Sequence, residues 1–207
     1  MSTVFTPNFT DNVSIISAAV LARGSVSRTT YDLRTKRGAW FFVRIGRGGT
    51  TAITTTPITA IIRRTLNNAG IINPSPDATY VAQLTAASST TVNSDSNSGQ
   101  SAVNVASSAG FAAGDIVCIQ DSGGGVTRLE WGRVSKVAAG VITLDSPLQY
   151  THTSAAADTV RNKGEAWAGW VDGGATYEIL IDYGSAGAGE SITIEVKAQT
   201  YDTDTGA

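Results

Sequence analysis

The sequence predicts an all-β protein: a β-sandwich of the jelly-roll type, with a smaller β-barrel or meander unit inserted into it. Runs of residues in which apolar and polar side chains alternate recur along the chain, and such runs are typical of strands with one buried face. Glycine-rich segments separate several of these runs. Near Thr85 the composition changes to a tract rich in serine and threonine, which marks the start of a different unit.

Three segments carry the clearest signals for strands of the sandwich. Residues 40–45 (WFFVRI) are aromatic and β-branched, and both faces of the run are apolar, which favours a central strand. Residues 177–183 and 191–197 alternate between apolar and polar side chains, and the glycine-rich residues 184–189 between them predict a hairpin connection. In residues 58–66 the isoleucines also fit helical spacing, but the composition rich in threonine and isoleucine predicts a strand.

The middle of the chain, residues 85–162, is predicted to form a separate unit. Residues 85–108 predict a long loop or weak edge strands, and three compact strands follow at 115–120, 128–137 and 141–144. Because inserting a domain at a surface loop costs little loop-closure entropy, we predict three parts. They are an N-terminal arm (1–12), a sandwich domain (13–84 with 163–207) and an inserted small β domain (85–162). The arm and residues 86–107 hold little apolar surface, so we expect both to order only in an assembly.

Composition excludes several classes of protein. Charged residues make up 15% of the 207 residues, against roughly 25% in an average soluble protein. A surface of serine, threonine, asparagine and glycine suits a protein packed in an assembly, although an ordinary threonine-rich β protein would look the same. The net charge of −2 predicts no nucleic-acid partner, and the cluster of Arg34, Lys36 and Arg37 is interpreted as a solvated sheet face. No apolar run is long enough for a membrane span and no secretory signal is visible.

Candidate catalytic and metal-binding residues are scarce. His152 is the single histidine and Cys118 the single cysteine, which excludes a zinc site built from several such ligands. No serine lies in a G-x-S-x-G sequence, and residues 95–99 begin like a calcium loop but continue with Gln100 and Ala106 where glycine and glutamate are required. We therefore predict no enzyme, no cofactor and no metal, with His152 as a structural residue and Cys118 as a buried, unreactive thiol.

Aromatic side chains supply the candidate interaction surface. Exposed aromatic side chains form large rigid contact areas, so five of them are predicted to contact a protein or sugar partner. Packing in the core or at a sheet edge is the alternative for the tryptophans and the tyrosine. The candidate residues are Trp40, Phe42, Trp167, Trp170 and Tyr177.

A further pattern is carried by Phe111, Gly114, Asp115, Val117, Ile119, Val134, Val137, Ile142, Thr143, Leu144, Pro147, Leu148, His152 and Val160. With these residues, a stretch of about fifty residues resembles a small β module that recurs in phage virion proteins and related bacterial surface proteins. In that module a Gly-Asp pair makes a tight turn into a strand, and a Pro-Leu-to-His stretch closes the barrel. Residues 155–157 (AAA) depart from the module, which often has glycine there.

The stretches flanking this module, residues 31–50 and 177–201, are similar in style to capsid decoration (cement) proteins of tailed bacteriophages. The resemblance implies a virion structural protein that is made in the bacterial cytoplasm and has no catalytic residues. Its partners would be the major capsid protein and copies of itself, as a homotrimer. The alternative is a neck, tail or head-fibre component that binds a host glycan, because such proteins share the same composition and strand pattern.

Overall fold

The structure is a computed structural model, and it describes residues 13–47, 58–66, 71–72, 77–82, 87–121, 128–184 and 191–202. These residues form fourteen β-strands, and none of them lies in a helix. The predicted all-β class is therefore confirmed. Within the same ranges no helix could cross a membrane. The predicted N-terminal arm, residues 1–12, lies outside the described residues.

Eight strands and one short extra strand build the sandwich. The first sheet consists, in order, of β1 (Val13–Leu21), β14 (Ile192–Asp202), β3 (Lys36–Arg47) and β12 (Thr159–Asp172). The second consists of β2 (Val26–Asp32), β13 (Thr176–Asp182), β4 (Ile58–Leu66) and, beyond β4, β6 (Ala78–Ala82) and the short β5 (Ile71–Ile72). All these pairs are antiparallel. This strand order is that of a jelly roll, as predicted.

The sandwich core follows from the alternation of side chains along the strands. On β3 the odd-numbered residues 39–45 are buried between the sheets, so the even-numbered residues 40–46 face away. Strand β4 is the segment with ambiguous spacing, and its Ile58 and Ile62 point into this core. On β13 both faces are buried, because Arg28 and Arg63 form ion pairs with Glu178 on the face predicted to be solvated.

The inserted unit is a small barrel to which β12 also contributes. Its strands are β7 (Ser89–Thr91), β8 (Ala102–Asn104), β9 (Ile116–Gln120), β10 (Leu129–Ala138) and β11 (Val141–Leu144). They pair in the order β7-β12-β9-β10-β11-β8. The curled sheet closes where Val92 bridges Val105 and the backbone N–H of Ala106 donates to the carbonyl of Thr91 at 2.9 Å.

The serine- and threonine-rich tract forms part of this barrel. Strands β7 and β8 lie in it, and Val92, Val103 and Val105 contribute to the barrel core. The prediction that residues 86–107 order only in an assembly is therefore wrong for the described residues 87–107. Three spaced valines are enough to attach the tract to the barrel, because neighbouring strands supply the rest of the core, while residues 93–95 and 97–100 stay exposed.

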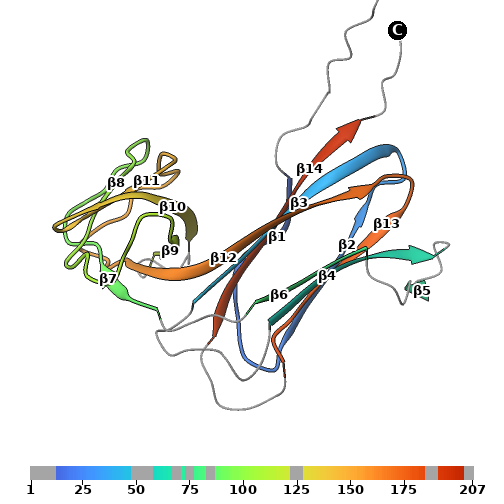
Figure 1. The fold of residues 1–207 in the computed structure, drawn as a ribbon, viewed down its shortest axis with the longest axis horizontal. Coiled ribbons are helices and arrows are strands. Elements are labelled where there is room, and N and C mark those ends of the chain that lie inside the picture. The colour runs from blue at the N-terminus through green and yellow to red at the C-terminus, as the bar shows by residue number, and fades with distance from the viewer. Residues whose placement is uncertain are drawn as a thin grey trace, which may run out of the picture.

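Strand β12 joins the two units (Figure 1). Its first residues pair with β7 and β9, and its later residues pair with β3. The register shifts between Arg161 and Gly164, and Lys163 within this bulge has a φ of +59°. The predicted domain boundary at 162/163 falls inside this bulge. Buried residues form one core cluster on each side of it, and the division into domains stays a prediction.

Hydrogen bonds to Asp115 hold the bulge in place. The carboxylate of Asp115 accepts bonds from Nζ of Lys163 and from Nδ2 of the buried Asn162, both at 2.7 Å, and one from the backbone N–H of Ala112. Burial raises the pKa of Asp115, but these bonds outweigh burial and hold the pKa below its usual value. Gly114 and Asp115 match the Gly-Asp pair of the small β module. Through Asp115 this turn is thus hydrogen-bonded to β12, the strand that continues from the barrel into the sandwich.

Candidate functional site

The candidate site is the outer face of the first sheet, the face turned away from the sandwich core. On β3 this face presents Trp40, Phe42 and Arg44, and β12 presents Trp170 directly opposite Trp40. Strand β14 adds Glu195 beside Arg44, and also Lys197 and Gln199. The outer face is thus aromatic at one end and charged at the end that meets the barrel.

Trp40 and Trp170 form an exposed pair at the aromatic end. Each is 39% exposed, and their ring centroids lie 5.9 Å apart at an angle of 64°. Nε1 of Trp170 donates to Oδ1 of Asp172 at 3.0 Å, and the ring lies over Gly38, where a Cβ would be 2.2 Å from Cζ2. Gly38 and Asp172 therefore fix the position of the Trp170 ring on the surface.

The structure separates the five predicted surface residues. Trp40, Phe42 and Trp170 share the outer face, whereas Trp167 lies on the inner side of β12 and stacks on Tyr80 at 6.0 Å. Tyr177 is fully buried in the sandwich core, and its hydroxyl donates to the carbonyl of Asp172 at 2.5 Å. Tyr177 thus does not belong to a surface, because its strand points it between the two sheets.

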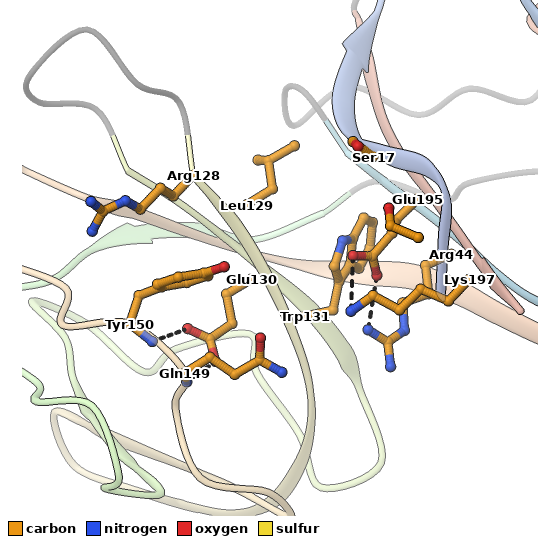
Figure 2. Close-up of a pocket in the computed structure, with 11 residues that line it drawn as sticks. Ser17, Arg44, Arg128, Leu129, Glu130, Trp131, Gln149, Tyr150, Glu195 and Lys197 are labelled. Atoms are coloured by element: carbon orange, nitrogen blue, oxygen red, sulfur yellow. Dashed lines mark hydrogen bonds and ion pairs between the residues drawn. The ribbon is translucent and has the colours of Figure 1, made fainter. Parts of the chain in front are cut away.

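A polar cleft lies at the other end of the outer face, between the sandwich and the barrel. Its volume is about 340 Å³. The lining residues are Ser14 and Ser17 of β1, Arg44, Glu195 and Lys197 of the outer face, and Arg128, Leu129, Glu130, Trp131, Gln149 and Tyr150 of the barrel (Figure 2). Sequence reasoning missed these residues, because they come from distant segments and share no motif.

The ring of Trp131 forms the contact between barrel and sheet beside this cleft. A Cβ on Gly46 of β3 would lie 2.4 Å from Cη2 of Trp131, and one on Gly164 would lie 3.3 Å from Cζ3. Nε1 of Trp131 is buried and has no hydrogen-bond partner among the described residues. The missing side chain at Gly46 thus makes room for the indole ring and lets the barrel approach the sheet.

His152 is a buried structural residue, as interpreted from the sequence. It is fully buried, with Nε2 3.0 Å from Oε2 of Glu130 and Nδ1 3.2 Å from Oδ2 of Asp158. The same Glu130 accepts bonds from the backbone N–H groups of Gln149 and Tyr150. This network holds in place the segment between β11 and β12, which carries the cleft residues Gln149 and Tyr150.

Cys118 and the basic residues also have structural partners. Cys118 is buried, and burial raises the pKa of its thiol to about 12. Arg44 pairs with Glu195 at 3.0 Å, and Arg34 pairs with Asp32 at 2.7 Å. Among the described residues no group of histidine, cysteine and carboxylate side chains is arranged to hold a metal ion.

Comparisons with known proteins leave the family open. No protein-family model matches the chain, and no curated protein matches it. One similar solved structure is a CocE/NonD family hydrolase from Staphylococcus aureus, with a TM-score of 0.29 and 8% identity over 93% of this chain. The chain spans 34% of the length of that hydrolase.

Another is VP17, a capsid protein of bacteriophage P23-77, with a TM-score of 0.22, 10% identity, and coverage of 97% of this chain and 99% of VP17. Both TM-scores are too low to indicate a shared fold, so neither an activity nor a role in a capsid follows from them. What the described residues define is a class of architecture: a jelly-roll sandwich with a small barrel inserted before β12.

Proposed function

We propose that this protein is a non-enzymatic structural component of a bacteriophage particle, and that it binds and reinforces the capsid shell as a decoration protein. The observation that carries the proposal is the aromatic end of the outer face, where Trp40, Phe42 and Trp170 offer apolar surface on a rigid sheet. Such a patch marks an interaction site when it is partly exposed in the free protein. Jelly rolls occur in viral capsids and also in unrelated proteins, so the fold is compatible with this role without implying it.

The burial of the candidate reactive groups supports a role without catalysis. A general base must reach the proton that it removes, and His152 is enclosed by Glu130, Asp158 and the barrel wall. A thiol nucleophile must form a thiolate, and the buried Cys118 has a pKa of about 12.

In the proposal the partners are the major capsid protein and further copies of this chain, with a trimer as the expected form. A closed oligomer would present the same outer face several times to a symmetric shell. Because a decoration protein binds the assembled shell and not its dissociated subunits, it would raise the resistance of the shell to disruption.

Co-sedimentation with assembled, undecorated shells tests the proposal. We expect the native protein to sediment with the shells, and Trp40→Ser and Trp170→Ser to weaken binding because they remove apolar contact area. Val81→Ser is the matched control, because Val81 is 53% exposed but lies on the second sheet. Failure of the native protein to bind shells, or equal binding by all three variants, would refute the proposed role.

A host-glycan-binding neck, tail or fibre protein is the second candidate. The observation that favours it is the Trp40–Trp170 pair, since exposed aromatic faces also stack on sugar rings. Trp167 has no place in this alternative, because it packs on the inner side of β12. Binding of host polysaccharide that is lost in Trp40→Ser and Trp170→Ser, without binding to shells, would favour this candidate.

A further inference from the structure

The polar cleft carries an excess of positive charge. Three cationic side chains line it, namely Arg44, Arg128 and Lys197, against the two carboxylates of Glu130 and Glu195. The cleft thus has a formal charge of +1, whereas the whole chain has −2. A local excess of this sign attracts an anionic ligand.

Both carboxylates of the cleft already have partners within the protein. Glu195 forms ion pairs with Arg44 at 3.0 Å through Oε2 and with Lys197 at 3.2 Å through Oε1. Glu130 accepts from the backbone N–H of Gln149 at 2.6 Å through Oε1, and Oε2 is shared by Tyr150 N–H and His152. Glu130 and Glu195 are 6% exposed, so neither offers a ready acceptor to a ligand.

The groups that remain for a ligand are mainly donors. Arg128 is exposed and lines the cleft, and its guanidinium lies 5.4 Å from the centroid of the Tyr150 ring. Lys197 keeps further N–H donors beyond the one that bonds to Glu195. The hydroxyls of Ser14 and Ser17 and the side chain of Gln149 are exposed around the cleft.

Aromatic faces complete the cleft. Tyr150 is 39% exposed and Trp131 lies on the sheet beside Glu195 and Arg44 (Figure 2). A cavity of about 340 Å³ is within the range of small-ligand sites. Cationic donors next to flat aromatic faces suit a sugar ring that carries several hydroxyl groups and one anionic group.

We propose that this cleft binds an acidic saccharide, a sugar unit that bears a carboxylate or a phosphate group. Arg128 and Lys197 bind the anionic group, the serine hydroxyls and Gln149 bind the sugar hydroxyls, and the ring of Tyr150 contacts the sugar face. The site is separate from the Trp40–Trp170 pair, and the inference does not depend on the role in the capsid.

Calorimetric titration of the whole chain with three probes tests the proposal. The probes are trigalacturonic acid for the carboxylate, glucose phosphate for the phosphate, and maltotriose as the neutral sugar. We expect at least one anionic probe to bind more tightly than maltotriose, and the binding to weaken as salt is added. The anionic probe that binds identifies which acidic group the cleft takes.

Arg128→Gln and Lys197→Gln should each weaken that binding about tenfold, because each removes one charge-assisted hydrogen bond. Arg34→Gln is the matched control, because Arg34 is exposed, paired with Asp32 and placed in the turn between β2 and β3. The indole N–H signal of Trp131 should shift on titration in NMR spectra more than those of Trp40 and Trp170. The proposal is overturned if no anionic probe binds, if maltotriose binds equally well, or if the variants bind as the native protein does.

Discussion

The ring of Trp131 in the barrel lies against the backbone of Gly46 in the sandwich. A Cβ at Gly46 would lie 2.4 Å from Cη2 of Trp131 and 2.6 Å from Oγ1 of Thr193, so no larger residue fits without a shift. The two residues are far apart in sequence, and their contact sets how closely the barrel approaches the outer face. Trp131 also lines the polar cleft.

Gly46→Val should therefore displace the barrel from the sheet. We expect an overpacking cost of about 1–3 kcal/mol in the free energy of unfolding and a change in the Trp131 environment. Chemical denaturation followed by tryptophan fluorescence measures both. Ala168→Val is the control, because Ala168 is exposed on the same sheet face. If Gly46→Val is as stable as this control, the contact does not position the barrel.

His152→Ala should destabilise the barrel. The change leaves Glu130 and Asp158 buried without the ring that lies between them, and breaking such a buried network costs about 3–5 kcal/mol. Urea denaturation measures the loss, and Tyr150→Phe, which keeps an exposed ring nearby, should unfold like the native protein. A native-like free energy of unfolding for His152→Ala would show that the network contributes nothing.

Asp115→Asn should weaken the bulge that connects the two units. The amide would place an N–H group against the donors of Lys163, Asn162 or Ala112, at a cost of about 1–3 kcal/mol near neutral pH. Because the folded pKa of Asp115 is lowered, its stabilising effect is complete above the unfolded pKa of about 4 and is lost as pH falls through the folded value.

The difference in unfolding free energy between native protein and Asp115→Asn should thus shrink in acid. Denaturation at neutral pH and at a pH below the folded pKa checks this. Asp145→Asn, at an exposed position, is the control. A difference that stays constant across this range would mean that the carboxylate charge is not what holds the bulge.

Ala157 has a φ of +52°, the left-handed region that favours glycine. The small β module often has glycine in this turn, so the departure noted in the sequence falls on a strained residue. Ala157→Gly should raise the free energy of unfolding by about 0.5–1 kcal/mol, because relief of the strain exceeds the added entropy of the unfolded chain.

Thermal unfolding measures this gain. Ala155→Gly is the matched control, since Ala155 lies in the same turn without a positive φ, and it should be neutral or destabilising. The reverse order of the two variants would contradict the account of this turn.

The parts of the fold that are encoded locally could be predicted. Strands β13 and β14 carry their own alternation of side chains, β3 carries an aromatic and β-branched run, and the composition of β4 outweighs its helical spacing. The role of the serine- and threonine-rich tract could not be predicted, because Val92 and Val105 become core residues only through partners far along the chain.

The site was predictable only in part for the same reason. Trp40 and Phe42 follow from the pattern of one strand, but the partner of Trp40 depends on its register with β12. Tyr177 was a candidate for the surface with core packing as the alternative, and the structure places it on the side of β13 that faces the sandwich core. The cleft joins β1, β3 and β14 to the barrel, so no local pattern could reveal it.

Imaging of phage particles that contain this protein, at a resolution that locates individual copies, is the most direct test of the proposed decoration role. We expect many copies spread over the shell at its three-fold positions, with the outer face of the first sheet, including Trp40 and Trp170, against the major capsid protein. Few copies, confined to one vertex or to the tail, would contradict the decoration role and favour the neck, tail or fibre alternative.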